Sequence, residues 1–206
     1  MKNTIKATVI SLTAIALQSS LSAAQAFNFE DPKGVNTISF TLDAPLETIS
    51  GTTNGVTGTV DYDPANPEAM SGTIVVDATS IVVPNPVMLE HLHSEGWINS
   101  GEHEEITFDA GSVSNVKKDG DTVTADIKGT FTFHGVSQEI TAPLTITYLP
   151  GKLKARNGGD VDGDLLVIRS NFEINRSDFG VKPGQATDKV AEDVEVSFAL
   201  VGYAAS

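Results

Sequence analysis

Hydrophobic and polar residues alternate with a period of two through residues 122–148, with a break at residues 135–138. Before the break the apolar row is Val123, Ala125, Ile127, Gly129, Phe131 and Phe133, and after it Ile140, Ala142, Leu144, Ile146 and Tyr148. This period belongs to a β-strand with one buried face, and a helix cannot use it. The stretch therefore predicts two long strands joined by a turn. At ~3.3 Å per residue the first would span roughly 35 Å, which suggests a tall barrel wall.

Weaker alternation elsewhere predicts further strands over residues 38–42, 56–62, 72–83, 166–176 and 194–200, and one that begins at Ile106. Residues 45–54 are expected to connect two strands, and residues 150–163 to form a loop rich in glycine and charge. Only residues 87–97, which follow a Pro-Asn-Pro break, are expected to be helical. About eight strands without βαβ spacing predict an all-β fold, either a sandwich or a closed antiparallel barrel. The long strands favour the barrel, whose interior would hold side chains or one small ligand.

The N-terminus has the pattern of a secretory signal peptide over residues 1–26. Lys2 and Lys6 precede an apolar run at residues 7–17, and Ala-Gln-Ala at residues 24–26 forms a small-x-small cleavage site. The mature chain, residues 27–206, is then expected to be one periplasmic or secreted domain. No later stretch could cross a bilayer as a helix.

The charge and the cysteine content exclude several functions. The chain carries 13 basic and 27 acidic residues, for a net charge of −14, so it is unsuited to nucleic acid and to anionic lipid surfaces. It contains no cysteine, which rules out disulfides, thiol catalysis and thiolate metal sites. The sequence does not fix the oligomeric state, and a homodimer is compatible with it.

Three ordered segments carry a resemblance to a known family. Residues 129–136 read Gly-Thr-Phe-Thr-Phe-His-Gly-Val, and residues 174–181 read Ile-Asn-Arg-Ser-Asp-Phe-Gly-Val. Earlier in the chain, His-Leu-His-Ser at residues 91–94 is followed by Ile-Thr-Phe at residues 106–108. These segments are similar, in order, to motifs of the YceI-like proteins, and the similarity extends over roughly residues 29–203.

The resemblance implies an exported, lipocalin-like, eight-stranded antiparallel barrel that binds a long-chain isoprenoid or similar lipid in an apolar lumen, with no cofactor. Two departures concern the expected polar contacts. Asp-Pro-Lys-Gly at residues 31–34 lacks the histidine of the family's N-terminal motif, and Met88 and Leu89 replace an Arg-Asp pair. The resemblance therefore leaves the ligand's head group open.

The residues expected to line the lumen belong to the inward rows of four strands. They are Val123, Ala125, Ile127, Gly129, Phe131, Phe133, Leu144, Ile146, Phe172, Ile174 and Phe198. Gly129 either leaves space for a ligand chain or marks a bend of the strand. Arg176 shares an apolar strand face, and a buried cation needs a partner. That partner is either the ligand head group or, the alternative that we favour, a carboxylate such as Asp178.

A second functional class uses His91, His93 and His103, which lie among glutamates and form the only metal-like cluster. On a helix His91 and His93 would lie about 200° apart, so a solvated acidic surface explains them better, and no metal site is predicted. The sequence also lacks a nucleophile elbow and a phosphate-binding loop, so we expect a binding protein and no enzyme. The alternative to a lipid carrier is a periplasmic metal-handling or catalytic protein that uses these histidines.

Overall fold

The computed structural model describes residues 24–206. The predicted signal peptide therefore lies outside the described residues, apart from its last three. Strand β1 (Gln25–Asn28) includes both sides of the expected cleavage point, and Phe27, the expected first residue after cleavage, is fully buried. The predicted cleavage stays a prediction.

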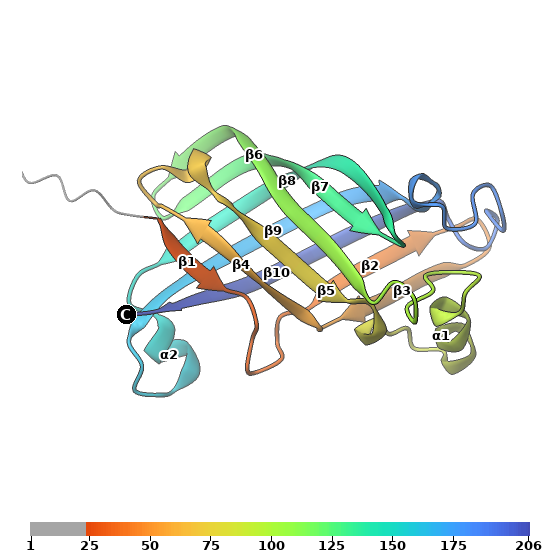
Figure 1. Ribbon diagram of the computed structural model, residues 1–206, viewed down its shortest axis with the longest axis horizontal. Helices are drawn as coiled ribbons and strands as arrows, with labels where there is room; N and C mark the ends of the chain where they lie inside the picture. Colours follow the sequence, from red (N-terminus) through yellow and green to blue (C-terminus); the bar gives the residue numbers. More distant parts are fainter. Residues whose placement is uncertain (1–23) are drawn as a thin grey trace, which may run out of the picture.

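Antiparallel strands make up most of the described chain (Figure 1). After β1 they are β2 (Ile38–Asp43), β3 (Thr48–Thr53), β4 (Val56–Tyr62), β5 (Ser71–Asp77), β6 (Glu105–Asp119), β7 (Thr122–Phe133), β8 (Val136–Leu149), β9 (Gly163–Asn175) and β10 (Asp193–Ala205). The helices are α1 (Pro86–His93), α2 (Leu153–Asn157) and the 3₁₀ turns η1 (Pro67–Ala69), η2 (Ala78–Ser80) and η3 (Arg176–Phe179). Helices α1 and α2 lie at opposite ends of the elongated molecule.

Eight of the strands close into a barrel. Their order is β1-β4-β5-β6-β7-β8-β9-β10, and the ring closes where Asn28 of β1 pairs with Tyr203 of β10. The β2–β3 hairpin extends the sheet from the other half of β10, and β3 touches the chain after β5 through a bridge between Thr52 and Val82. The predicted eight-stranded antiparallel barrel is confirmed, with β2 and β3 added beside it.

Three local predictions were wrong. Residues 45–54 contain β3, which alternation could not reveal because Gly51 and the threonines around it form no apolar row. The strand predicted over residues 72–83 ends at Asp77, where the Asp77 side chain accepts a hydrogen bond from the Thr79 N–H and starts η2. The loop at residues 150–163 contains a second short helix, α2, which buries Leu153.

The two halves of the barrel interior are filled differently. At the α2 end Phe27, Tyr62, Ile146 and Leu166 are almost wholly buried and belong to one hydrophobic core. Toward α1 the inward aromatic rings of β7, β9 and β10 are only half buried although they point into the barrel. One end of the barrel is therefore a solid core, and the other end is hollow.

Candidate functional site

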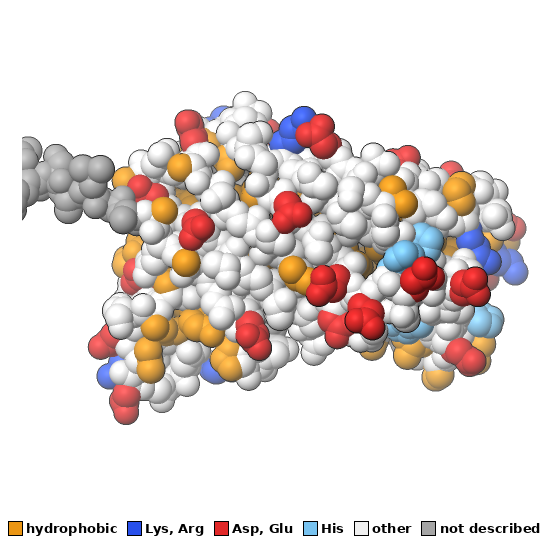
Figure 2. All heavy atoms as spheres, in the orientation of Figure 1, with side chains coloured by type: hydrophobic (Ala, Val, Ile, Leu, Met, Phe, Trp, Pro, Cys, Tyr) orange, Lys and Arg blue, Asp and Glu red, His pale blue; other side chains and the backbone are white. Residues whose placement is uncertain are grey.

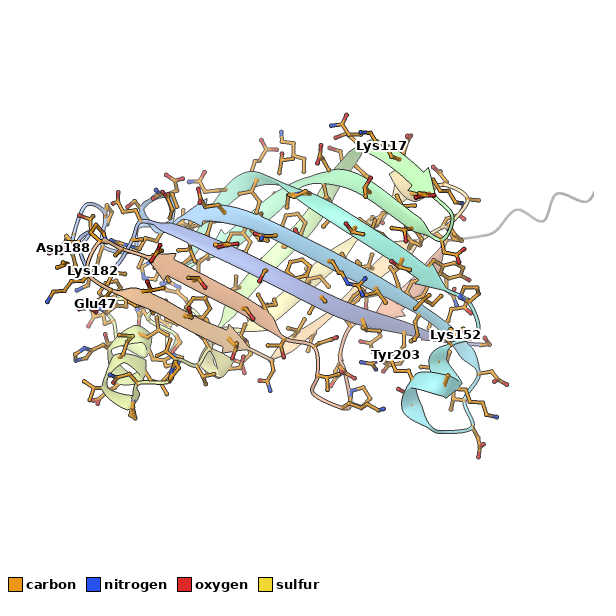
Figure 3. The ribbon with its side chains drawn as sticks, turned by 180° about the vertical axis from the view of Figure 1, so that it is seen from behind. Glu47, Lys117, Lys152, Lys182, Asp188 and Tyr203 are labelled. Atoms are coloured by element: carbon orange, nitrogen blue, oxygen red, sulfur yellow. The ribbon has the colours of Figure 1, made fainter. Side chains whose placement is uncertain are left out.

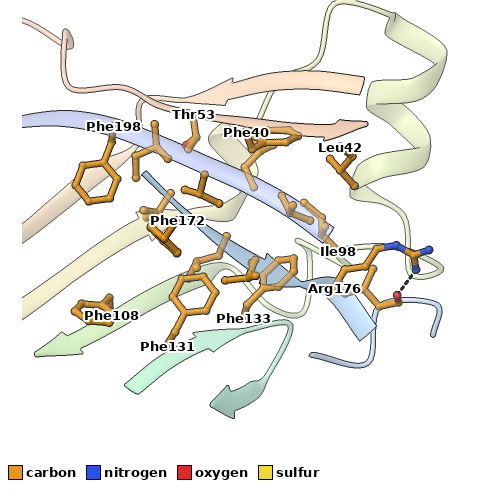
Figure 4. A pocket seen from close by; sticks show the side chains of 18 of the residues that line it. Phe40, Leu42, Thr53, Ile98, Phe108, Phe131, Phe133, Phe172, Arg176 and Phe198 are labelled. Carbon is orange, nitrogen blue, oxygen red and sulfur yellow. Dashed lines mark hydrogen bonds between the residues drawn. The ribbon is translucent and has the colours of Figure 1, made fainter. Parts of the chain in front are cut away.

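The hollow half of the barrel contains a cavity of about 590 Å³. Its walls come from β2, β3 and β4–β10, and α1 with the chain after it covers one end. Figure 4 shows the rings of Phe40, Phe108, Phe131, Phe172 and Phe198 around it. Almost all of the lining side chains are hydrocarbon, so the cavity suits an apolar ligand.

The cavity reaches solvent at the α1 end, where several lining residues are exposed. They are Glu47 in the turn between β2 and β3, Val87 and His91 on α1, and Lys189 in the loop before β10. We call this group the mouth. Glu47 lies near Lys182 and Asp188 in Figure 3, at the end of the barrel away from Lys152. Charged and titratable groups therefore gather at the mouth, and the interior remains apolar.

Seven predicted lumen residues line the cavity. They are Ile127, Phe131, Phe133, Leu144, Phe172, Ile174 and Phe198. Val123, Ala125 and Ile146 also point inward, but they are buried in the solid half and do not reach the cavity. The period-two pattern identifies the inward face of a strand, and it does not show how far along that face the interior is filled.

Gly129 does not leave open space for a ligand. A Cβ placed at Gly129 would meet the backbone carbonyl oxygen of Asp109 and would stand 2.5 Å from Cζ of Phe108, and both residues belong to the neighbouring strand β6. Nearby, the register of β6 against β7 shifts between Ala110 and Ser112, as it does at a β-bulge. Of the two alternatives for Gly129, space for a ligand chain was wrong, and a strand irregularity is present beside it.

Arg176 is 2% exposed and sits where β9 ends and η3 begins. Its guanidinium donates five hydrogen bonds, all to backbone carbonyls of the loop before β10. Nε bonds Ala191 at 2.9 Å, Nη1 bonds Val181 and Lys182 at 2.6 Å each, and Nη2 bonds Gln185 at 2.7 Å and Val190 at 3.1 Å. The expected carboxylate partner was wrong. No guanidinium hydrogen remains for a ligand head group either.

Two features of its surroundings shift the pKa of Arg176 in opposite directions, and the net shift is downward. Burial lowers its pKa, and the nearby carboxylate of Glu192 acts in the opposite direction. The centroid of the Trp97 ring lies 5.8 Å from the guanidinium carbon of Arg176 and 4.9 Å from Nζ of Lys182. Arg176 thus fixes the loop of residues 181–191, which frames one side of the mouth.

The three candidate metal-binding histidines have separate roles. His93 donates from Nε2 to the Ile81 carbonyl (2.9 Å), and its Nδ1 lies 2.8 Å from Oγ of Ser100, which ties α1 to the chain segments before and after it. His91 is exposed at the mouth, and the ring of His103 packs against that of His134 with 4.8 Å between centroids. Histidine and acidic side chains are common on the surface near α1 in Figure 2. Within residues 24–206, however, no three histidine or acidic side chains are placed to hold a metal ion.

Several cavity residues were missed in the sequence. Ile38, Phe40 and Leu42 on β2, together with Phe108 on β6, line the cavity. The alternation around these residues predicted strands. Their apolar rows could have been assigned to the lumen by the argument used for residues 123–133, that the apolar face of a strand points into the barrel. The contribution of α1, through Val87 and Met88, depends on how the helix folds over the barrel end, and no local pattern reports that.

No helix in the described part of the chain is both long and apolar enough to cross a membrane. The solved structures that the fold matches include that of BcnA from Burkholderia cenocepacia, at a TM-score of 0.67 and 19% identity over 81% of this chain and 95% of that one. A polyisoprenoid-binding domain from Saccharophagus degradans, implicated in plant cell wall breakdown, matches at a TM-score of 0.63 and 14% identity over 89% and 99% of the two chains. These likenesses concern the fold.

Sequence comparison gives the family. A UPF0312 protein of Pectobacterium atrosepticum is 28% identical over 207 aligned positions, which cover 96% of this chain and 97% of the relative. A UPF0312 protein of Pseudomonas fluorescens SBW25 is 28% identical over 72% of each chain. The family model of the YceI-like domain matches residues 27–202, which include the whole barrel except the end of β10 and the start of β1. The chain belongs to the YceI-like family.

Proposed function

We propose that this protein binds a long-chain isoprenoid or a similar lipid in the hollow half of the barrel, and that it carries or sequesters this lipid outside the cytoplasm. The cavity of about 590 Å³, with its hydrocarbon lining, is the observation that carries the proposal. Its volume lies within the ~300–1,000 Å³ typical of small-molecule sites. The extracytoplasmic location depends on the signal peptide expected at residues 1–26.

Burial of hydrocarbon is the driving force that this cavity offers. Each buried methylene contributes ~0.8 kcal/mol, so ten give ~8 kcal/mol. Association itself costs ~4–15 kcal/mol, so a short chain would bind weakly and a useful ligand is long. The half-buried rings of Phe131, Phe172 and Phe198 would lose further water contact when a chain fills the cavity.

The polar end of the ligand would lie at the mouth. Inside the cavity Arg176 has used all its donors, and the hydroxyl of Thr53 is bonded to that of Ser80. Glu47, His91 and Lys189 are the polar groups at the mouth that a head group would meet. The polyisoprenoid-binding domain of similar fold supports this class of ligand, and the fold likeness by itself does not name the lipid.

The first experiment is native mass spectrometry of the protein purified from its own host, followed by lipid extraction. The expected result is a co-purified species with a long hydrocarbon chain, and the same spectra report whether the chain is a homodimer. Val196→Trp provides the structural test, because Val196 of β10 lines the cavity between Phe172 of β9 and Phe40 of β2.

Ala199→Trp is the matched control, since Ala199 is an exposed residue on the same strand. Val196→Trp should fold and bind less lipid per protein, whereas Ala199→Trp should bind as much as the wild type. Equal lipid content in both variants, at unchanged melting temperature, would contradict binding in the cavity.

A further inference from the structure

The barrel wall is interrupted between β8 and β9. These strands pair only from Thr145↔Arg169 to Leu149↔Leu165. Beyond that point β8 continues to pair with β7 down to Val136, and β9 continues to pair with β10 up to Asn175. Residues 136–144 and 170–175 therefore flank an interval without a backbone ladder. We call this interval the seam; both strands can be followed in Figure 3.

The sequence itself ends the ladder, through Pro143. This residue stands two positions before Thr145, the last residue of β8 that pairs with β9, and it keeps its register with Asp126 of β7. Proline has no N–H to donate, so in a strand it is tolerated where its nitrogen faces away from the paired neighbour. A side-chain bond replaces the ladder here, since the Ser170 hydroxyl donates to the Pro143 carbonyl at 2.7 Å.

The seam opens on the cavity. Ile140 and Ala142 on one edge, with Phe172 and Ile174 on the other, all line it. Ile140 and Phe172 are only half buried. Along the seam, side chains form the wall without backbone hydrogen bonds, and apolar side chains can rotate aside without leaving a donor or acceptor unpaired.

The mouth is held more firmly than the seam. The loop on one side is fixed by the five hydrogen bonds of Arg176. On the other side, the His93 ring bonds Ile81 before α1 and Ser100 after it, and the Asn85 side chain caps the first turn of α1 by accepting from the N–H groups of Val87 and Met88. Two side-chain bonds close the far end of the seam: Gln138 donates to the Asp178 carbonyl and Nδ1 of His134 donates to the Phe179 carbonyl, each at 3.1 Å. Between this end and the Ser170–Pro143 bond the seam is held by apolar side chains.

We propose that the seam is a side entrance of the lumen, through which a long acyl or isoprenoid chain passes between β8 and β9. This inference rests on the proposed lipid binding. The cavity is closed at the solid half of the barrel. If the chain entered through the mouth, the displaced water would have to leave through the same opening while the whole length of the chain passed in. A chain that enters sideways lies down along the cavity while its polar end remains at the mouth.

The absence of cysteine from the chain allows a direct test by cross-linking. Thr141→Cys with Glu173→Cys places two exposed thiols on opposite edges of the seam, to be joined by a reducible bis-thiosulfonate reagent. Glu173→Cys with Glu195→Cys joins directly paired residues of β9 and β10 and is the matched control. A third pair, Glu90→Cys with Asp188→Cys, joins α1 to the loop before β10 across the mouth, and neither residue lines the cavity.

The probe is cis-parinaric acid, a long-chain fatty acid whose fluorescence rises in apolar surroundings, added to delipidated protein in a stopped-flow instrument. Cross-linking the seam should slow uptake by about tenfold or more, and reduction should restore the rate, as for other gated sites. The control pair and the mouth pair should leave the rate within about twofold of the uncross-linked protein.

Unchanged uptake after the seam is cross-linked, or slow uptake only after the mouth is cross-linked, would overturn the side entrance while leaving lipid binding intact. If the uncross-linked protein takes up no probe and yields no lipid from its own host, the proposed function is wrong and the side entrance falls with it. A probe that is loaded first should stay bound longer after the seam is closed.

Discussion

The phenyl ring of Phe108 on β6 lies over the backbone of Gly129 on β7, so close that a Cβ at Gly129 would be 2.5 Å from Cζ of the ring. Gly202 is covered in the same way by the ring of Phe29. At both positions an aromatic ring thus occupies space that the missing side chain leaves, and it shields the backbone from water. Gly129 and Gly202 therefore accommodate aromatic rings, and they leave no opening for a ligand.

Gly129→Ala should therefore lower the free energy of unfolding by about 1–3 kcal/mol, because the methyl group would press on the backbone carbonyl oxygen of Asp109 and on the ring of Phe108. Urea unfolding measures the loss. In a double-mutant cycle with Phe108→Ala the alanine at position 129 should cost less than in the wild type. The same cost in both backgrounds would mean that the carbonyl of Asp109, and not the ring, excludes a side chain at position 129.

The fold could be predicted from the sequence because burial on one side of a strand imposes a period of two, which is visible without knowledge of any partner. The long strands β7 and β8 are examples. The strand β3 could not be predicted, since it is defined by pairing with β2 and its pattern lacks an apolar row. Short β1 is likewise stabilised by pairing with β4, and its first two residues fall within the predicted signal peptide.

The apolar character of the candidate site could be predicted from the sequence, but the part of the barrel interior that the cavity occupies could not. Inward rows showed that Phe131 and Phe172 belong to the lumen. They could not show that Val123 and Ile146 lie in a filled core, because that depends on how residues from distant strands meet. Arg176 illustrates the same limit, because its partners are carbonyls of a loop whose path no local pattern reveals.

The neighbouring histidines of α1 should respond differently to mutation. His93→Ala should lower the free energy of unfolding by about 1–3 kcal/mol, because it leaves the Ile81 carbonyl and the Ser100 hydroxyl without their partner. His91→Ala changes an exposed side chain and should stay within ±0.5 kcal/mol. Thermal unfolding compares them, and metal analysis after dialysis should give the same content for both variants. A stoichiometric metal that disappears with His91 would revive the metal-handling alternative.

Asp31 should make the protein sensitive to acid. Burial alone would raise the pKa of its carboxyl group, but hydrogen bonds from Arg156 and from the N–H groups of Lys33 and Val35 outweigh it and hold the pKa below the ordinary 3.8. The folded state therefore prefers the ionised form, so this stabilisation is complete above pH ~4 and is lost as the pH falls through the lowered pKa. Asp31→Asn should be less stable at neutral pH and should show a flatter decline below pH ~4. An unchanged acid profile would exclude this role.

Tyr148 should make the stability of the protein sensitive to alkaline pH. Burial and the hydrogen bond that its hydroxyl donates to Asp164 (2.6 Å) raise its pKa from 10.0 to about 12. The folded state holds the proton more tightly than the unfolded state, so stability falls as the pH rises from 10.0 toward about 12. Burial also raises the pKa of Tyr62, which adds a decline of the same sign. Tyr148→Phe should remove part of the loss, as measured by urea unfolding across this range together with the phenolate absorbance.

Arg176→Gln separates a structural role from a ligand-binding one. The substitution removes the charged fork that bonds five loop carbonyls, so we expect the free energy of unfolding to fall by about 3 kcal/mol. Hydrogen exchange and proteolysis of residues 181–191 should accelerate, because that loop loses its anchor. Any loss of bound lipid should be indirect, because it follows from the disorder of this loop at the mouth and not from a lost contact between the guanidinium and the lipid. Arg169→Gln, an exposed change on β9, is the matched control and should stay within ±0.5 kcal/mol. A stable Arg176→Gln protein with an intact loop and weaker lipid binding would show instead that the guanidinium holds the head group.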